Sequence, residues 1–117
     1  MNSFTIYHNP KCSKSRETLA LLQEHGIQPK VIEYLKTPPT AAELEAIIAR
    51  LGITPEQLVR KGEDIYKANY AGRKLTDAHW IEAMVSHPIL IERPIVVSGN
   101  RAVIGRPPQN VNQLLAK

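Results

Sequence analysis

The stretch SFTIYHNPKCSKSRETLALLQEHGIQPKVIEYL, residues 3–35, decides the fold. Its first part, residues 3–7, alternates apolar and polar side chains and is rich in β-formers, which predicts a strand. Residues 13–25 carry clustered leucines and end at Gly26, which predicts a helix with a glycine stop. Residues 31–35 predict a second strand. A strand, a helix and a strand in this order form a βαβ unit, in which the two strands run parallel through a right-handed crossover.

The middle of the chain, about residues 38–88, predicts a helical insert. Thr40 and Glu43 stand three positions apart, as in a capping box, and apolar residues follow at helical spacing. Further along we expect two shorter helices, at residues 54–59 and 76–87, and between them a polar loop with room for one turn of helix, at residues 61–74. No Gly/Ser-rich linker separates the insert, so we expect a single domain over residues 1–117.

The C-terminal part predicts a β-hairpin followed by a helix. PIVVS (94–98) and AVIG (102–105) flank the turn-forming pair Gly99-Asn100. The last helix is expected from Asn110 to about Ala116. The element order is therefore β-α-β, a helical insert, then β-β-α. This order predicts an α/β fold with a mixed four-stranded sheet, which is the thioredoxin-like arrangement.

Composition and charge narrow the function. The chain is 43% hydrophobic and 22% charged, which is typical of a globular protein. Its net charge of +4 can attract anions, but the basic residues do not form a block and aromatic residues make up only 5%, which argues against nucleic-acid binding. No apolar run approaches the roughly 18 residues of a membrane span, and no leader peptide is recognisable. We therefore expect a cytoplasmic protein with no membrane partner.

Cys12 is the only cysteine in the chain, which excludes an internal disulfide and fits a reducing compartment. It lies in the turn between the first predicted strand and helix, where unpaired helix N–H groups favour a negative charge. A cysteine in such a place, beside cations, can have a pKa lowered from about 8.5 to roughly 3.5–7.5. The nearby groups that can contribute are His8, Lys11, Lys14 and Arg16. A buried structural cysteine is the alternative, but these polar neighbours favour a reactive thiolate.

Two more side chains belong to this candidate site. Ser15 follows three residues after the cysteine, so we expect its hydroxyl to hydrogen-bond the sulfur across the first helical turn. His8 can serve as a base, as a hydrogen-bond partner or as a packing residue. The other histidines have no cysteine or carboxylate at a metal-ligand spacing, so we expect no metal site.

With these residues identified, the whole chain resembles the glutaredoxin-coupled arsenate reductase family. The resemblance spans most of the sequence and keeps its segments in order. The matching segments are IYHNPKCSKSRETL (6–19), LVRKGE (58–63), HPILIERPIVV (87–97) and IGRPP (104–108). The family has a thioredoxin-like fold with a helical insert, as the element order already predicts.

The resemblance implies that Cys12 attacks arsenate while Arg60, Arg93 and Arg106 hold the oxyanion. A thiolate that attacks an arsenate dianion meets a repulsion of roughly 4 kcal/mol per unit-charge pair at about 4 Å and an effective dielectric of about 20. Arginine suits this task because its planar, permanently charged fork binds tetrahedral oxyanions in a bidentate way. Arginines that meet at the thiolate would stabilise the transition state.

The resemblance also implies that His8 and Ser15 help to hold Cys12 as a thiolate, and that the Arg93-Pro94 bond lies where thioredoxin-like folds carry a cis-proline. It implies no bound cofactor. Glutathione would be the co-substrate that forms a mixed disulfide with Cys12, and glutaredoxin would regenerate the thiol by exchange. This agrees with Ser15 in place of a second cysteine, which argues against a thioredoxin-style disulfide reductase.

Two other functions stay open. A thiol oxidoreductase of the same fold can act on another substrate, and a redox-responsive regulatory adaptor can use a related fold, although such adaptors typically carry a Cys-x-x-Cys switch. Lys14 departs from the family pattern, which has small uncharged residues between the cysteine and the serine. Its charge beside the nucleophile leaves open the identity of the oxyanion and the effect on the pKa of Cys12.

Overall fold

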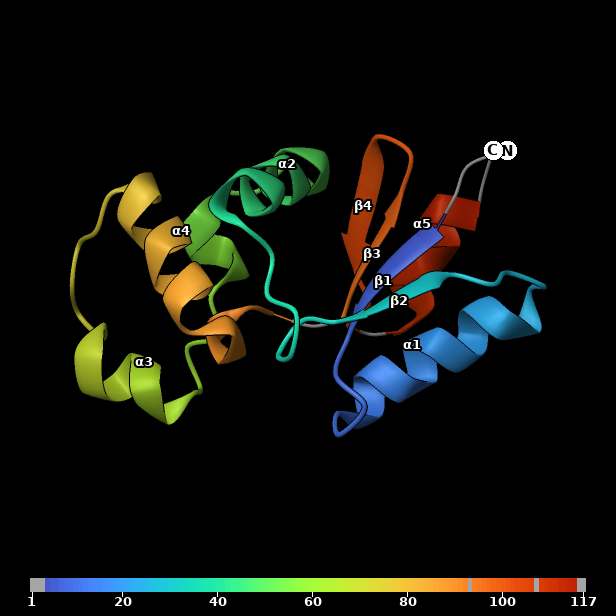
Figure 1. The fold of residues 1–117 in the computed structure, drawn as a ribbon, viewed down its shortest axis with the longest axis horizontal. Helices are drawn as coiled ribbons and strands as arrows, with labels where there is room; N and C mark the ends of the chain where they lie inside the picture. The colour runs from blue at the N-terminus through green and yellow to red at the C-terminus, as the bar shows by residue number, and fades with distance from the viewer. Residues whose placement is uncertain (1–3, 93, 107, 116–117) are drawn as a thin grey trace. The chain divides into compact units, whose positions relative to one another are not determined.

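The computed structural model describes residues 4–92, 94–106 and 108–115. The chain divides into two compact units, one made of Met1–Thr37 with Arg93–Lys117 and the other of Pro38–Glu92. The first unit holds the sheet, and the second holds the helices expected in the insert (Figure 1). None of the helices in the described ranges is both long and apolar enough to cross a lipid bilayer.

A mixed four-stranded sheet forms the first unit, and its order is β2-β1-β3-β4. Strand β1 pairs in parallel with β2 and antiparallel with β3, and β3 pairs antiparallel with β4. The strands are β1 (Phe4–His8), β2 (Lys30–Glu33), β3 (Ile95–Ser98) and β4 (Arg101–Ile104). The predicted fold class is confirmed, both in the parallel pair of the βαβ unit and in the antiparallel hairpin.

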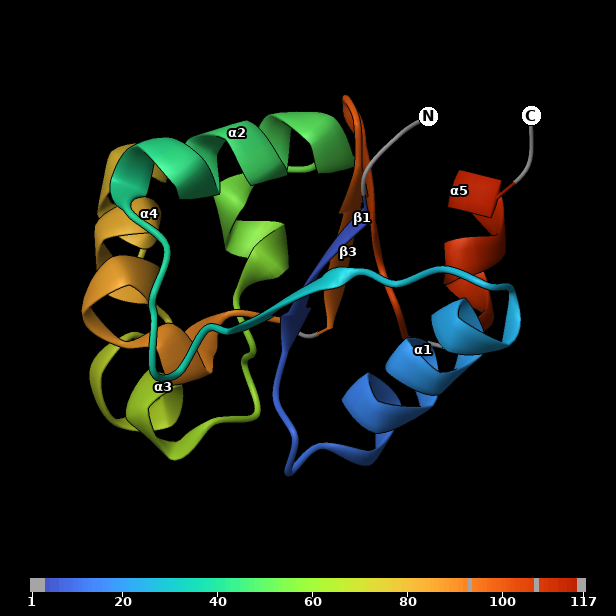
Figure 2. The same cartoon turned by 45° about the vertical axis from the view of Figure 1, so that its right-hand side comes forward.

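Helices α1 (Ser13–Glu24) and α5 (Asn112–Leu115) cover one face of this sheet (Figure 2). The apolar side chains beneath them form one buried cluster, which includes Ile6, Leu22, Val96, Val111 and Leu114. These residues come from two strands, from α1 and from the C-terminal helical segment. Burial of apolar area from segments far apart in sequence is the main force that holds such a layer together.

Two element boundaries differ from the prediction for local reasons. Strand β2 ends at Glu33, because the carbonyl of that residue accepts hydrogen bonds from the N–H groups of Lys36 and Thr37, which turn the chain. The C-terminal helix begins earlier than expected, as a 3₁₀ turn over Pro108–Val111, before α5. Its expected end at Ala116 lies outside the described residues.

The second unit is helical, and its elements are α2 (Ala41–Leu51), the 3₁₀ turn Pro55–Leu58, α3 (Asp64–Asn69), α4 (Asp77–Ser86) and the 3₁₀ turn Pro88–Leu90. Thr40 and Glu43 form the predicted capping box at the start of α2. Helix α3 is longer than the single turn expected in this polar stretch. Its Tyr66 stacks on Trp80 of α4 with ring centroids 6.2 Å apart, which accounts for a helix that its polar sequence hardly favours.

A short backbone bridge joins two distant segments of the second unit. Val59 pairs antiparallel with Ile91. The Arg60 N–H donates to the Leu90 carbonyl at 2.7 Å, and the Glu92 N–H donates to the Leu58 carbonyl at 2.8 Å. These bonds fix the backbone of Arg60 next to the end of the unit.

Candidate active site

Cys12 occupies the N-cap position of α1, as the sequence predicts. Its backbone is extended (φ −99°, ψ 123°), and its own N–H donates to the Asn9 carbonyl at 2.9 Å. The thiol is partly exposed and its side chain does not cap the helix. The sulfur therefore lies at a helix N-terminus, where the backbone N–H groups of the first turn favour an anion.

Arg106 lies against this sulfur. Its Nη1 donates toward Cys12 Sγ at 3.9 Å, across 94 positions of sequence. The arginine follows β4 and Gly105, while the cysteine precedes α1, so the contact depends on the packing of the whole first unit. A guanidinium at this distance stabilises a thiolate relative to a thiol, because it interacts favourably only with the charged form.

His8 and Ser15 form a buried pair behind the cysteine loop. Their side chains are 6% and 0% exposed, and His8 Nδ1 lies 2.7 Å from Ser15 Oγ. The same hydroxyl accepts a hydrogen bond from the Asn9 N–H at 3.0 Å. The prediction that this hydroxyl bonds the Cys12 sulfur needs correction. Ser15 faces the interior of the unit, and its hydroxyl meets the histidine and the loop backbone instead.

Burial lowers the pKa of His8 below its ordinary value of 6.5, and Arg16 adds to the lowering, while Glu33 raises it in part. The imidazole is therefore neutral at pH 7. His8 does not belong among the cations that were expected to stabilise the thiolate. Its contribution to the site is the hydrogen bond to Ser15, which fixes the end of β1 against the first turn of α1.

Two of the expected cations have partners of their own. Lys14 Nζ lies 3.6 Å from Glu17 Oε2 on the next turn of the helix. Arg16 Nη1 donates to the Pro10 carbonyl at 2.8 Å, which holds the arginine against the loop. Arg106 is thus the cation whose contact with Cys12 Sγ is explicit in the structure.

Asn9 organises the loop, and the sequence reasoning missed it. Its side chain is buried, and its Oδ1 accepts a hydrogen bond from the Lys11 N–H at 3.0 Å. Its backbone bonds both Ser15 Oγ and the Cys12 N–H. The available signal was an asparagine before a proline, a pair that often starts a turn through a side-chain bond to the backbone two residues on.

Of the other two predicted arginines, Arg60 belongs to the second unit and Arg93 lies outside the described residues, as does the predicted Arg93-Pro94 bond. Arg60 Nε lies 3.5 Å from Glu63 Oε2 and 3.8 Å from Glu92 Oε1. Its Nη1 is buried and has no hydrogen-bond partner among the residues that the structure describes. The described geometry brings together His8, Cys12, Ser15 and Arg106.

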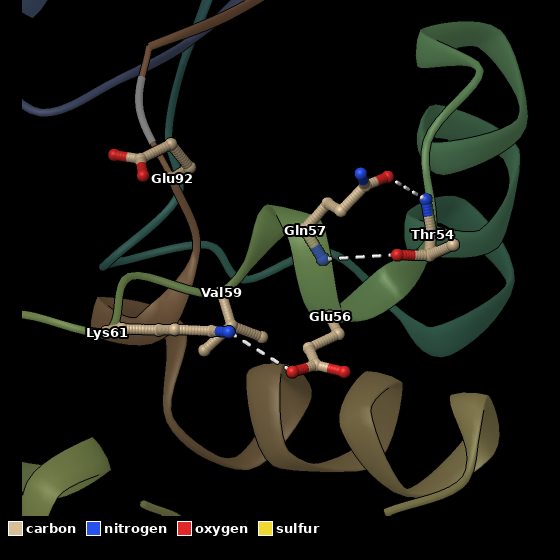
Figure 3. A pocket seen from close by; sticks show the side chains of 6 residues that line it. All are labelled: Thr54, Glu56, Gln57, Val59, Lys61 and Glu92. Carbon is tan, nitrogen blue, oxygen red and sulfur yellow. Dashed lines mark hydrogen bonds and ion pairs between the residues drawn. The ribbon is translucent and has the colours of Figure 1, made fainter.

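A hollow of about 600 Å³ lies beside Arg60 in the sequence, within the second unit (Figure 3). Two carboxylates, Glu56 and Glu92, line it, and its ammonium group, Lys61 Nζ, lies 3.1 Å from Glu56 Oε2. Gln57 and Thr54 on its wall bond each other in a second capping box. Since carboxylates repel anions and the cation is paired, this hollow is a poor oxyanion site.

The sulfur site is therefore suited to nucleophilic attack on an anion rather than to metal chemistry. Across residues 4–92, 94–106 and 108–115, no three His, Cys, Asp or Glu side chains gather in a way that could hold a metal ion. What the site does offer is a sulfur at a helix N-terminus, an arginine beside it and a buried hydrogen-bond network behind it.

Comparisons with known proteins point the same way. A family model described as the ArsC family matches residues 7–114. The uncharacterized protein YfgD of Escherichia coli is 50% identical over 112 residues, which cover 94% of each chain. An arsenate reductase of Haemophilus influenzae is 47% identical over 115 residues, covering 97% of this chain and 99% of its own. A solved arsenate reductase from Vibrio cholerae superposes with a TM-score of 0.91 at 49% identity, covering 96% of this chain and 97% of its own.

Proposed function

Because this chain belongs to the ArsC family, we propose that it reduces arsenate to arsenite with the Cys12 thiolate as nucleophile. The observation that carries the proposal is the Arg106 Nη1 contact at 3.9 Å from Cys12 Sγ, at the N-cap of α1. Near-full-length relatives named arsenate reductase, from Haemophilus influenzae and Vibrio cholerae, support it.

In this proposal Arg106 acts with Arg60 and Arg93 as the oxyanion site. A guanidinium fork can bind two arsenate oxygens at once and offset the repulsion between the thiolate and the substrate. Arg60 has a buried Nη1 without a hydrogen-bond partner among the described residues, so it retains a donor for such an oxygen. Buried donors without partners are rare in folded proteins and often mark sites that bind something.

The first chemical step is attack of the Cys12 thiolate on arsenic(V). The S–As bond forms, and one arsenate oxygen leaves as water after protonation. The two anions approach more easily beside Arg106, which stabilises the charge that is spread over sulfur and the arsenate oxygens in the transition state. His8 and Ser15 support the step by holding the loop that carries the sulfur, since both are buried and bonded to each other.

The second step needs a thiol from outside, because the chain contains one cysteine. We propose that the glutathione thiolate attacks the Cys12 sulfur. The S–As bond then breaks with its electron pair on arsenic, which becomes arsenic(III), while the two sulfurs are oxidised together to a mixed disulfide. Protons from water complete the arsenite. A glutaredoxin thiolate then attacks the glutathione sulfur and releases the Cys12 thiolate.

Glutathione is thus a co-substrate, and the proposal needs no bound cofactor. A reducing compartment such as the cytoplasm, where glutathione keeps thiols reduced, is the setting that we propose.

A coupled assay tests the proposal directly. Purified protein, arsenate, glutathione, glutaredoxin and glutathione reductase should consume NADPH at a rate that depends on arsenate, and arsenite should appear in equal amount. Omission of either glutathione or glutaredoxin should stop the reaction, and Cys12→Ser should abolish it. If arsenate causes no turnover while Cys12 still reacts with an alkylating agent, the substrate is a different one. A Cys12→Ser variant that stays active would instead show that the nucleophile is misassigned.

The arginine site has a test of its own. Arg60→Lys keeps the charge but loses the fork, so it should raise the KM for arsenate more than Lys61→Arg, a matched exchange at the next position whose ammonium is paired with Glu56. Unchanged arsenate kinetics in Arg60→Lys would count against a bidentate contact at this position.

A further inference from the structure

The backbone bend that carries Arg106 is tied down on several sides. The Gly105 N–H donates to the Pro94 carbonyl at 2.8 Å. The side chain of Asn110 reaches back from the next turn, and its Nδ2 donates to the carbonyls of Ile104 at 2.9 Å and Arg106 at 3.2 Å. A side chain that starts from such a fixed backbone has fewer positions open to it.

The remaining carbonyl of this bend is held by Thr18, from the middle of α1. Thr18 Oγ1 lies 3.1 Å from the Gly105 carbonyl oxygen and 2.8 Å from the Lys14 carbonyl oxygen, so its one proton is shared between the two acceptors. The side chain is 0% exposed. A buried carbonyl that lost this donor would be left without a protein partner for its second lone pair or would have to shift.

The approach between Thr18 and Gly105 is so close that only glycine fits. A Cβ at position 105 would lie 2.7 Å from Thr18 Oγ1, 2.9 Å from Thr18 Cγ2 and 2.9 Å from Pro94 Cγ. Real Cβ atoms essentially never come this near to another atom. The glycine thus lets α1 and the bend meet at the position directly before the arginine.

The two ends of this arrangement are the two partners of the sulfur contact. Helix α1 carries Cys12 at its N-cap, and the bend carries Arg106, whose Nη1 lies 3.9 Å from Cys12 Sγ. Thr18 is the side chain of α1 that bonds the bend. We propose that Thr18 is a positioning residue, which sets the distance between Arg106 and Cys12 through its hydrogen bond to the Gly105 carbonyl.

This inference rests on the proposed function in taking Cys12 as the nucleophile, but it can be tested on the thiol alone. The rate of Cys12 alkylation by iodoacetamide is measured against pH for the wild type, Thr18→Val, Thr18→Ser and Arg106→Gln. Valine has the shape of threonine without the hydroxyl, while serine keeps the hydroxyl. We expect the midpoint of the profile to move to higher pH in Thr18→Val, at least half as far as in Arg106→Gln. Thr18→Ser should stay near the wild type.

A double variant separates positioning from general packing. If Thr18 acts through Arg106, then Thr18→Val should cause no further shift of the midpoint in an Arg106→Gln background. An equal shift in both backgrounds, or a Thr18→Ser variant that shifts as far as Thr18→Val, would overturn the proposal. Thr18→Ala removes the same hydroxyl without a new methyl group, so it replaces Thr18→Val if circular dichroism shows that the valine variant is unfolded.

The arsenate assay then distinguishes the two proposals. Where arsenate is the substrate, Thr18→Val should raise the KM for arsenate about threefold or more, and Thr18→Ser should restore it. If the alkylation profiles behave as expected but arsenate is not reduced in the wild type, the proposed function fails and the positioning role stands. If arsenate is reduced but the Thr18→Val profile equals the wild type, the positioning role fails and the function stands.

Discussion

The contact between Arg106 and Cys12 allows a quantitative prediction. Arg106→Gln removes the positive charge and keeps a side chain of similar polarity. At 3.9 Å a pair of unit charges interacts with about 1 kcal/mol in water and about 4 kcal/mol at an effective dielectric of about 20. Arg106 is exposed, so we take the lower figure. Since about 1.4 kcal/mol corresponds to one pH unit, the midpoint of the Cys12 alkylation profile should rise by about 0.7 pH unit.

The matched control is Lys14→Gln, which removes the same charge only two positions from the cysteine. Lys14 Nζ lies 3.6 Å from Glu17, so its field at the sulfur is largely cancelled by a neighbouring carboxylate. We expect a shift of the midpoint of less than about 0.3 pH unit for this variant. Both profiles should be measured by mass spectrometry at low and at high salt, because screening weakens an exposed pair.

The outcome that would refute the reasoning is a larger shift in Lys14→Gln than in Arg106→Gln. The charge that matters to the sulfur would then be set by sequence proximity rather than by the contact across the fold.

Three further predictions concern the network behind the sulfur and the helix caps. Ser15→Ala leaves His8 Nδ1 and a loop N–H without their buried partner, so the free energy of unfolding in urea should fall by about 1–3 kcal/mol, and a loss below about 0.5 kcal/mol would contradict the network. The lowered pKa of His8 means that the unfolded chain binds its proton more readily, so stability should be lost as the pH falls below 6.5, with a slope of at most about 1.4 kcal/mol per pH unit that His8→Gln removes. Thr40→Ala should cost about 1 kcal/mol of unfolding free energy because Thr40 caps a full α-helix, and Thr54→Ala should cost less because its 3.4 Å bond caps one 3₁₀ turn; the reverse order would refute this.

The fold was predictable because its signals are local. The alternation of the first strand, the Thr40 capping box and the Gly99-Asn100 turn each depend on a few neighbouring residues, and all were confirmed. Helix α3 was underestimated because its polar sequence gives little periodic signal. Its stacking of Tyr66 on Trp80 is a contact between helices that no local pattern reveals.

The site was predictable only in part, for a similar reason. The place of Cys12 at a helix N-terminus follows from the order of strand and helix. The meeting of Cys12 with Arg106 spans most of the chain and was expected only from the family resemblance. The direction of Ser15 depends on which face of α1 is buried, and the neutral state of His8 depends on its burial, so neither could be read from spacing.

The structure also gives Lys14 a place. Its ammonium pairs with Glu17 along the helix, so the charge that departs from the family pattern is directed away from a purely local role at the sulfur. The Lys14→Gln experiment above measures what remains of its influence.

The position of Cys12 has a consequence for how inactive variants should be interpreted. The residue sits at the N-cap of α1 with the extended backbone that capping residues adopt, yet its side chain does not cap the helix. Serine is among the best residues at this position and adds about 0.5–2 kcal/mol relative to alanine. A Cys12→Ser protein should therefore melt at a higher temperature than the wild type, while Cys12→Ala should not. The nucleophile occupies a place where another residue would make a sturdier protein, so natural selection at this position has favoured reactivity over resistance to unfolding.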